Sequence, residues 1–363
     1  MPLFDLGPKE SRRSLYGRDQ ELDTLVRLIE NRRWCVILGP RMVGKTSLAK
    51  AGVRQSKVPS VYVNLWGTRG VAGLLDSLTE GLNSNRSLLR RVADALRGIQ
   101  GVSLLGSGVS FAPQPRPLRT FHEVLSALGR RAGRLVVVLD EVQELAPASG
   151  SFLKLLGNVF NTYPNVGFVF TGSRFGLIRT LLSPSANSPL YGRSPVPIEL
   201  GPFEPMASTE FLRRGFDEYG VSVDPAQISQ VVSRSLDGIP GWLTYFGNCV
   251  AVRRTEFDAA ERITIAEGKK VVASELRHYL EGRDVATHWA ALRALCVPLS
   301  WSEFRDGVSA SRKVPLNDNS VRNILRALQE SGFVAETAHR YQILDPMVRL
   351  FVAESARAPR PGN

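Results

Sequence analysis

Residues 39–46 combine two glycines, a lysine and a threonine at the spacing of an anion-binding loop. They read Gly-Pro-Arg-Met-Val-Gly-Lys-Thr, the pattern GxxxxGK[ST]. An apolar run at residues 34–38 precedes them and a helical pattern follows, which is the context of a phosphate-binding loop (P-loop). Backbone N–H groups of such a loop cradle the phosphates, Lys45 contacts the β- and γ-phosphates, and Thr46 offers its hydroxyl to Mg²⁺. The alternative is a chance match in a glycine-containing turn, which the flanking strand and helix disfavour.

A second pair of chemically competent residues stands where another apolar run ends. The run Leu135–Leu139 is typical of a central parallel strand, and Asp140 at its end can hold the hydration shell of Mg²⁺. Glu141 has the position of a general base that orients water for attack on the γ-phosphate. The alternative for Glu141 is an acid favoured at a helix N-terminus. An apolar run ending in Asp-Glu downstream of the loop favours the catalytic interpretation.

Together the two motifs predict a Mg²⁺-dependent ATPase whose cofactors are ATP or ADP and Mg²⁺. Lys45 and Glu141 are predicted to be catalytic, and Thr46 and Asp140 are predicted to bind the metal ion. The residues expected to bind the nucleotide through the loop are Gly39, Pro40, Arg41, Met42, Val43, Gly44, Lys45, Thr46 and Ser47.

The elements that must position these side chains alternate between strand-like and helical patterns. The expected strands are residues 34–38, 61–65, 135–139 and 166–170. Helical patterns between them predict an α/β fold with a doubly wound parallel sheet, whose strand carboxyl ends carry the chemistry. The last strand leads to Ser173 and Arg174, a hydroxyl and a guanidinium that can sense the γ-phosphate.

Two segments depart from this alternation. Residues 100–118 are rich in Gly, Ser and Pro but keep apolar residues on both sides of Gly-Ser-Gly, which predicts a hairpin or an ordered excursion. The proline-rich residues 183–205 mark the end of the sheet domain. Helical patterns follow, and a new unit is expected from residue 269 onward.

The C-terminal patterns have the order helix, helix, helix and hairpin, which is that of a winged helix-turn-helix. In the third helix, residues 320–329, apolar side chains share one face and Arg, Asn and Gln the other. Such polar side chains read base edges when a helix lies in the major groove, and a hairpin tip suits the phosphate backbone. The residues predicted to contact DNA are Arg322, Asn323, Arg326, Gln329, His339 and Arg340. The alternative is a solvated helix face on a protein-docking module.

The charge of the chain favours a polyanionic partner, duplex or branched DNA. Its 363 residues include 46 Lys or Arg and 34 Asp or Glu, a net charge of +12, and residues 1–100 alone carry 17 basic and 9 acidic side chains. A solvated basic surface is the alternative. No apolar run approaches the ~18 residues of a membrane span, and no secretory signal is found. Three scattered cysteines indicate neither disulfides nor zinc, so a cytoplasmic protein without a membrane partner is expected.

Taken in order, the motifs resemble the archaeal ATPase family of the STAND class of P-loop NTPases, with kinship to AAA+ initiators of the origin-recognition type. The matching elements are LYGRDQEL, GPRMVGKTS, VVVLDEVQEL, FVFTGSR, SPLYGRS followed by ELGPF, DGIPGWL and the C-terminal YQILDP. The first, fifth and sixth of these are more specific than the P-loop and the Asp-Glu motif, which many families share. The resemblance implies a parallel-sheet P-loop core of the ASCE, AAA+-like type, a helical lid and a C-terminal winged helix-turn-helix.

The resemblance also implies roles for three further residues. Arg18 would lie near the adenine or the lid, and Pro240 would pack on the base from the lid. Arg193 resembles an arginine that reaches a γ-phosphate, either in its own chain or in a neighbouring molecule through self-association. The alternative for Arg193 is a guanidinium that caps a turn. The lid has no clear GxxR arginine of the sensor-2 type, so the resemblance does not extend to an initiator-like hydrolysis switch.

These features predict a switch ATPase that binds ATP, hydrolyses it slowly, and binds DNA through a basic surface and the winged helix. The alternative function is that of a regulatory or signalling STAND ATPase whose winged helix docks a protein. A helicase or translocase is disfavoured because no further motor motifs are found. The predicted domains are an ATPase core at residues 1–202, a helical lid at 203–268, a winged helix at 269–355 and a polar tail at 356–363.

Overall fold

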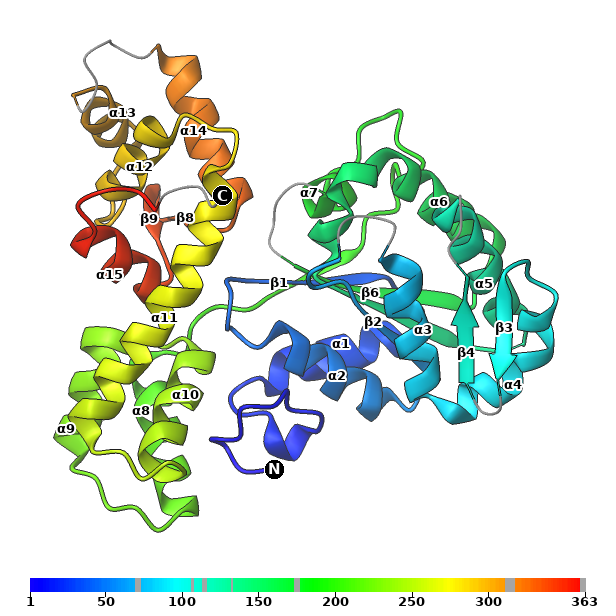
Figure 1. Ribbon diagram of the computed structural model, residues 1–363, viewed down its shortest axis with the longest axis horizontal. Coiled ribbons are helices and arrows are strands. Elements are labelled where there is room, and N and C mark those ends of the chain that lie inside the picture. The colour runs from blue at the N-terminus through cyan, green and yellow to red at the C-terminus, as the bar shows by residue number, and fades with distance from the viewer. Residues whose placement is uncertain are drawn as a thin grey trace. The chain divides into compact units, whose positions relative to one another are not determined.

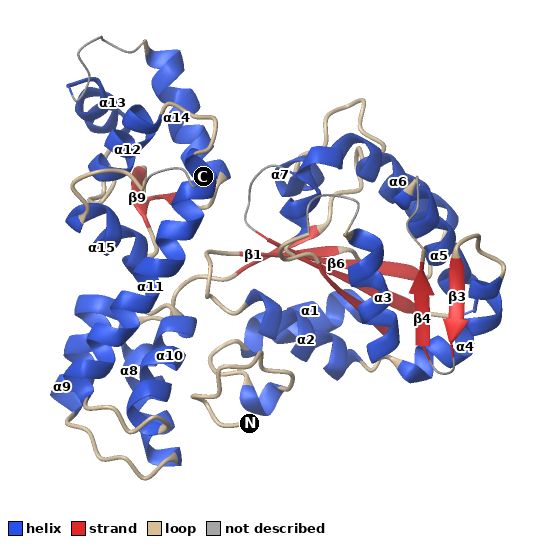
Figure 2. Cartoon of the chain, in the orientation of Figure 1, coloured by secondary structure: helices blue, strands red, loops and turns tan. Residues whose placement is uncertain are grey.

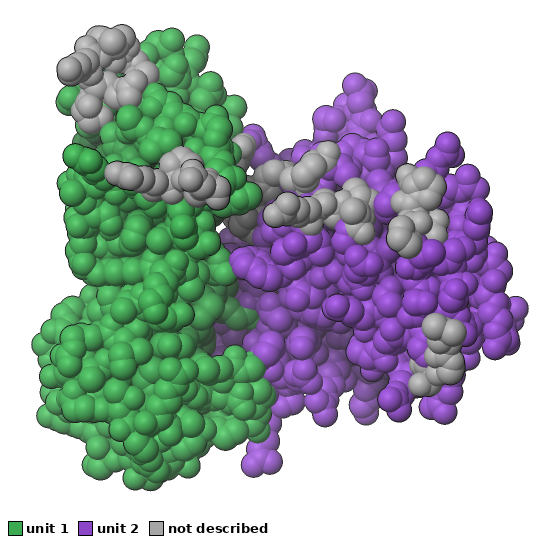
Figure 3. Space-filling view, viewed as in Figure 1, with its two compact units in different colours: residues 1–7, 40–44, 201–363 green, residues 8–39, 45–200 purple. Residues whose placement is uncertain are grey.

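The computed structural model describes residues 1–68, 73–105, 108–112, 116–131, 133–172, 177–310 and 317–359. The chain forms two compact units (Figure 3). Unit 1 comprises residues 1–7, 40–44 and 201–363, and unit 2 comprises residues 8–39 and 45–200. The first seven residues and the tip of the P-loop therefore belong to the same unit as the C-terminal half of the chain.

Unit 2 is built on a five-stranded parallel sheet with the strand order β2-β5-β6-β1-β7 (Figures 1 and 2). The strands are β1 (Cys35–Leu38), β2 (Ser60–Asn64), β5 (Leu135–Asp140), β6 (Val166–Gly172) and β7 (Val196–Glu199). Every residue of β1 and β5 is buried, as expected for parallel strands that helices cover on both faces. The α/β fold and its parallel sheet are thereby confirmed.

Helices pack on both faces of this sheet (Figure 1). The face that includes Val36 and Leu38 forms one large apolar cluster with the helices α3 to α7, whereas α1 and α2 pack together on the other face. The elements of unit 2 outside the sheet are η1 (Arg12–Ser14), α1 (Asp19–Glu30), α2 (Lys45–Ser56), α3 (Leu74–Ser84), α4 (Arg86–Arg97), α5 (Pro117–Arg131), η2 (Val142–Ala148), α6 (Ser149–Thr162) and α7 (Leu177–Leu182).

The two segments that depart from the alternating pattern both contain strands. Within residues 100–118, β3 (Val102–Leu105) and β4 (Gly108–Phe111) pair as an antiparallel hairpin, as expected. The proline-rich segment contains the strand β7, which the sequence pattern did not predict. Pro197 is tolerated there because β7 is an edge strand, where a missing N–H leaves no neighbouring strand unpaired.

Unit 1 is mainly helical. Its elements are α8 (Pro205–Glu218), α9 (Pro225–Val231), η3 (Val232–Leu236), α10 (Pro240–Ala251), α11 (Phe257–Leu280), α12 (Val285–Ala294), α13 (Trp301–Ala310), α14 (Asp318–Glu330), β8 (Val334–Thr337), β9 (Arg340–Ile343) and α15 (Pro346–Glu354). The helix α11 is continuous over 24 residues and passes through the position where a boundary was predicted. Gly268 within it permits α15 to approach, because a Cβ there would lie 2.5 Å from Cγ of Met347. No helix in the described ranges is long and apolar enough to cross a bilayer.

The N-terminal segment is anchored in unit 1 by Phe4. This side chain is fully buried, and a Cβ on Gly215 of α8 or on Gly247 of α10 would lie 2.2 Å from its ring. Asn248 donates a hydrogen bond of 3.0 Å from Nδ2 to the carbonyl oxygen of Phe4. The two glycines thus create the space that an aromatic ring from the chain terminus fills.

Candidate nucleotide site

The P-loop connects β1 to α2 by a tight turn of the backbone. Gly44 has φ of +99°, a value that glycine adopts without the steric cost that a Cβ imposes. Lys45, the first residue of α2, is only 8 % exposed, and its Nζ donates to the carbonyl oxygen of Gly39 at 3.0 Å. The ammonium group is therefore held across the loop, next to the helix N-terminus that supplies N–H donors to an anion.

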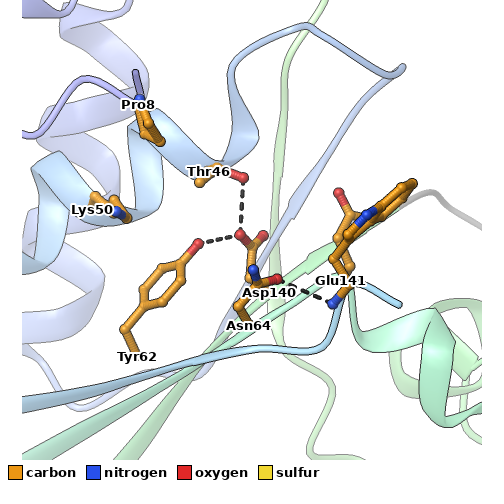
Figure 4. A pocket seen from close by; sticks show the side chains of 8 residues that line it. Pro8, Thr46, Lys50, Tyr62, Asn64, Asp140 and Glu141 are labelled. Atoms are coloured by element: carbon orange, nitrogen blue, oxygen red, sulfur yellow. Dashed lines mark hydrogen bonds between the residues drawn. The ribbon is translucent and has the colours of Figure 1, made fainter. Parts of the chain in front are cut away.

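Three hydroxyl groups converge on the carboxylate of Asp140, and Figure 4 shows two of them, those of Thr46 and Tyr62. Thr46 donates to Oδ2 at 2.9 Å, Tyr62 donates to the same oxygen, and Thr171 donates to Oδ1. The donors come from α2, β2 and β6, and β2 and β6 are the two neighbours of β5. A carboxylate beside a threonine hydroxyl is an oxygen donor set that suits Mg²⁺, so Thr46 and Asp140 fit the predicted metal ion.

Tyr62 was not singled out from the sequence. Burial, and after it the negative charge of Asp140, raise the pKa of the Tyr62 phenol, so this group stays a neutral hydrogen-bond donor. The ammonium of Lys50 lies 5.3 Å from the centre of the Tyr62 ring. Thr171 has a signal in the sequence, a hydroxyl close to the end of a largely apolar strand, whereas Tyr62 in the middle of β2 has none.

Glu141 is held by its backbone as well as by its side chain. Its φ is +58°, in the left-handed region that non-glycine residues rarely occupy. The N–H of Glu141 donates to Oγ1 of Thr171 at 3.0 Å, so one threonine hydroxyl binds both acidic residues. The Glu141 carboxylate in turn accepts a hydrogen bond from the side-chain amide of Gln143.

A pocket in unit 2 opens in front of these groups (Figure 4). The residues that line it are Pro8, Thr46, Lys50, Tyr62, Asn64, Trp66, Asp140 and Glu141. Both acidic residues of the predicted machinery face this pocket, with the lysine Lys50 on its wall. The arrangement provides an oxygen site for a cation and a carboxylate beside it that can accept a proton from water.

One predicted residue of unit 2, Arg18, does not line this pocket, and two others are not described. Arg18 stands at the start of α1, where it is 7 % exposed and donates to Glu21 at 3.3 Å, and burial lowers the pKa of its guanidinium. Ser173 and Arg174 lie outside the described residues. The predicted roles of all three residues therefore stay predictions.

Arg193 precedes β7 and so lies at the amino edge of the parallel sheet. Its guanidinium donates to Oδ1 of Asn161 at 2.6 Å and lies 5.1 Å from the centre of the Phe160 ring. The P-loop leaves the opposite, carboxyl edge, because β1 and β7 run parallel in register. Of the two predicted roles of Arg193, this placement is compatible with a contact to the phosphates of a neighbouring molecule.

Within unit 1, the tip of the P-loop contacts the segment that contains Pro240. The N–H of Gly241 donates to the carbonyl oxygen of Met42 at 2.8 Å, and Arg41 forms an ion pair with Glu275 of α11. Met42 has φ of +61°, and a Cβ on Gly241 would lie 2.7 Å from its Cβ. Pro240 therefore precedes the residue that contacts the loop tip, and its predicted contact with the base stays a prediction.

The residues predicted to contact DNA lie on α14 and at the β8–β9 turn. Those that are exposed are Arg322, Asn323, Arg326, His339 and Arg340, whereas Gln329 is half-buried. Ala338 and His339 have φ of +49° and +60°, the signs of a type I′ two-residue turn. The order of elements, α12, α13, α14 and a hairpin, agrees with the order expected from the sequence.

The sheet, the P-loop and the paired acidic residues together define a P-loop ATPase. The chain belongs to the family of ATPase domains found predominantly in Archaea, whose model matches residues 15–246. A comparison with curated proteins finds no match.

Solved structures agree with this assignment. The chain is similar to the Walker-type ATPase PABY2304 of Pyrococcus abyssi, with 28 % identity, a TM-score of 0.76, and coverage of 96 % of this chain and 99 % of that one. It is also similar in fold to the ORC2 protein of Aeropyrum pernix in its ADPNP–ADP complexes, with 16 % identity, a TM-score of 0.64, and coverage of 97 % and 96 %.

Proposed function

We propose that the chain is a Mg²⁺-dependent ATPase that hydrolyses ATP slowly and uses its nucleotide state as a switch on DNA. The observation that best supports ATP hydrolysis is that the Thr171 hydroxyl forms hydrogen bonds with both Asp140 and Glu141. Thr46 binds the other oxygen of the Asp140 carboxylate. This arrangement sets a metal-binding carboxylate next to a potential base at the end of one strand. The chemistry supplied by Mg²⁺ is neutralisation of phosphate charge.

Each residue of the site has a separate role in the proposed hydrolysis. Lys45 and the P-loop backbone bind the phosphates, Thr46 and Asp140 hold the cation, and Glu141 accepts a proton from water. The Tyr62 hydroxyl keeps the Asp140 carboxylate fixed on the side away from Thr171. We retain Ser173 and Arg174 as γ-phosphate sensors, Arg18 and Pro240 as nucleotide contacts, and Arg193 as a contact to a neighbour, all as predictions from the sequence.

Two substitutions test the ATPase. Lys45→Ala should abolish ATP binding measured by calorimetry, because the β- and γ-phosphates lose the ammonium group that neutralises them. Glu141→Gln should bind ATP normally but hydrolyse it about 10²–10⁴-fold more slowly, the usual contribution of a general base. Undiminished ATP affinity of Lys45→Ala, or wild-type turnover of Glu141→Gln, would contradict the assignment of the respective residue.

The switch is supported by the contacts between the P-loop tip and the predicted lid. Met42 and Arg41 touch α10 and α11 directly, so a nucleotide that moves the loop moves a contact of those helices. We propose the lid as residues 203–268 and a winged helix as residues 269–355. The expected outcome is slower hydrogen exchange across residues 236–246 when ATP or ADP is bound.

DNA binding is supported by an exposed basic surface on unit 2. Basic residues stand before three strands at the amino edge of the sheet, and within the described ranges none of them forms an ion pair. They are Arg32, Arg33, Lys57, Arg130 and Arg131. Hydrogen bonds hold these connections together, since Arg134 donates to the carbonyl oxygens of Ile29 and Glu30. A cluster of unpaired cations of this kind suits the phosphate backbone of a nucleic acid.

Fluorescence anisotropy with duplex, forked and single-stranded DNA at two salt concentrations, with and without ATP, tests this part. Affinity should fall steeply with salt, by ~0.9 in log K against log [salt] for each neutralised duplex phosphate. Arg322→Ala with Arg326→Ala should cost about 1–3 kcal/mol for each base that is no longer bound, and Arg33→Gln with Arg130→Gln should lower the salt slope. Lys154→Gln, at an exposed lysine of α6, is the control. If no form of DNA shows salt-sensitive binding, the proposal of DNA binding is wrong.

A second function is favoured by two contacts of the C-terminal elements. The guanidinium of Arg322 lies 4.8 Å from the centre of the Trp301 ring, and Arg340 pairs with Glu303 at 3.5 Å. Both side chains are thus engaged by α13. A domain whose basic residues contact its own helices fits a regulatory STAND ATPase that docks a protein. We propose this second function if the protein does not bind DNA.

A further inference from the structure

The side-chain amide of Gln143 joins Glu141 to the end of the neighbouring strand β6. Its Nε2 donates to Oε2 of Glu141, and it belongs to η2, which begins directly after Glu141. Its Oε1 is fully buried and has no hydrogen-bond partner among the described residues. Gln143 is therefore not a solvated surface residue that meets Glu141 by chance.

The space for this amide exists because residue 172 is glycine. A Cβ on Gly172 would lie 2.3 Å from Oε1 of Gln143 and 2.5 Å from Cδ1 of Ile178 in α7. Gly172 follows Thr171, whose hydroxyl binds Asp140 and the backbone of Glu141. The end of β6 thus fixes Glu141 twice, once through the main chain and once through the packed amide of Gln143.

Backbone restraint alone does not place the Glu141 carboxylate. The N–H bond to Thr171 fixes the main chain, but three side-chain torsions separate the carboxylate from that anchor. A hydrogen bond from an amide donor to a carboxylate is stronger than one between neutral groups, so it selects one arrangement of those torsions. Misplacement of a reacting group by about 1 Å can cost roughly 10²-fold in rate.

We propose that Gln143 is a positioning residue for hydrolysis: its packed amide holds the Glu141 carboxylate in the orientation that accepts a proton from water. This role rests on the proposed function, because it requires Glu141 to be the base. Gln143 does not touch the substrate in this scheme. Its removal leaves the P-loop, Thr46 and Asp140 unchanged, so binding of ATP and of Mg²⁺ should persist.

The test compares Gln143→Met, Gln143→Ala and Glu141→Gln, alone and combined. Methionine keeps most of the volume but lacks the N–H donor, so it separates the hydrogen bond from packing. Gln143→Met and Gln143→Ala should lower kcat roughly 10–100-fold with KM and ATP affinity unchanged. Adding Gln143→Met to Glu141→Gln should cause no further loss, because the positioned group is already gone. Gln227→Ala, on the exposed surface of α9, is the matched control.

The outcomes separate the two proposals. Wild-type kcat for Gln143→Met, with a large loss for Glu141→Gln, overturns the positioning role and leaves the ATPase intact. A loss that appears as a raised KM, or that adds fully to that of Glu141→Gln, also overturns it. Wild-type turnover of Glu141→Gln overturns the base assignment itself. Thermal unfolding should show that each variant is folded at the assay temperature, which excludes a folding defect as the cause of a lowered kcat.

Discussion

A single hydroxyl group, that of Thr171, links the two acidic residues of the nucleotide site. It donates to Asp140 and accepts from the N–H of Glu141 at 3.0 Å, and Thr171 is fully buried. The left-handed backbone of Glu141 depends on this acceptor, because a strained conformation persists only where its surroundings hold it. The arrangement of both acids is therefore a property of β6 as much as of β5.

Thr171→Val tests this dependence with a side chain of the same shape. The substitution leaves the Glu141 N–H and one oxygen of Asp140 without a partner, which should cost about 1–3 kcal/mol of unfolding free energy for each buried group. ATP hydrolysis should also need a higher Mg²⁺ concentration, because Asp140 is less well fixed. Urea unfolding and a Mg²⁺ titration of turnover measure the two effects.

Thr171→Ser keeps the hydroxyl and should stay close to wild type in both measurements. If Thr171→Val has the stability and the Mg²⁺ dependence of the wild type, the threonine does not organise the site. If Thr171→Ser loses as much as Thr171→Val, the methyl group rather than the hydroxyl is responsible.

The sequence alone identified those site residues that lie next to one another along the chain. The spacing of Lys45 and Thr46 within one loop, and the adjacency of Asp140 and Glu141, can be read directly. Tyr62 and Thr171 become neighbours of Asp140 only because β5 lies between β2 and β6. Strand order depends on long-range packing, which a local pattern does not encode.

At the scale of elements, the P-loop tip and the start of α10 are tightly packed. Gly241 donates to the carbonyl oxygen of Met42, and a Cβ on Gly241 would lie 2.9 Å from that oxygen. The helix begins with Pro240, whose missing N–H is no loss at a first helical position. The Pro-Gly pair thus starts a helix and admits a neighbouring loop at the same point.

Gly241→Ala should displace the loop and weaken ATP binding. The added methyl group meets Met42 backbone and side chain at less than contact distance, and overpacking of this kind costs about 1–3 kcal/mol. Calorimetry should show that cost as a loss of ATP affinity. Gly150→Ala, where a Cβ meets nothing within 4 Å, is the control and should bind ATP normally. Equal affinity of the two variants would show that α10 does not constrain the loop.

Elements were predicted best where a fully buried strand leaves a continuous apolar run, as β1 and β5 do. The strand β7 was missed because its prolines signal a turn, and its place at the sheet edge is not visible in the sequence. The predicted boundary at residue 268 falls inside α11. The sequence pattern changes near residue 268, but the helix continues, because its backbone hydrogen bonds depend only on residues four positions apart.

For the whole molecule, the first residues of the chain are part of the packing of its second half. Phe4 lies among Gly215, Gly247 and the ring of Phe216, whose centroid is 5.1 Å away. Leu3 adds a hydrogen bond of 2.8 Å from its N–H to Glu218. The apolar core formed by α8 and α10 therefore includes a side chain that lies far before these helices in the sequence.

Phe4→Ala should destabilise unit 1 by about 3–5 kcal/mol, the usual cost of emptying a buried phenylalanine site. For a unit of this size such a loss should lower the unfolding temperature by roughly 6–20 °C. Calorimetric scans should show this shift in the transition of unit 1. Met206→Ala, which truncates a side chain that is 86 % exposed, should leave the scan unchanged. An unaltered transition in Phe4→Ala would mean that the N-terminal segment is dispensable for stability.

The uninterrupted helix α11 gives unit 1 the mechanics of a lever. Its 24 residues span about 36 Å, and near its C-terminal end Glu275 holds Arg41 of the P-loop tip, while near its start Glu261 holds Arg234 of η3. A rod of that length that turns by about 10° at one end sweeps its other end through about 6 Å. Because α10 and α15 pack against α11, a turn of this helix would displace its far end together with both neighbours.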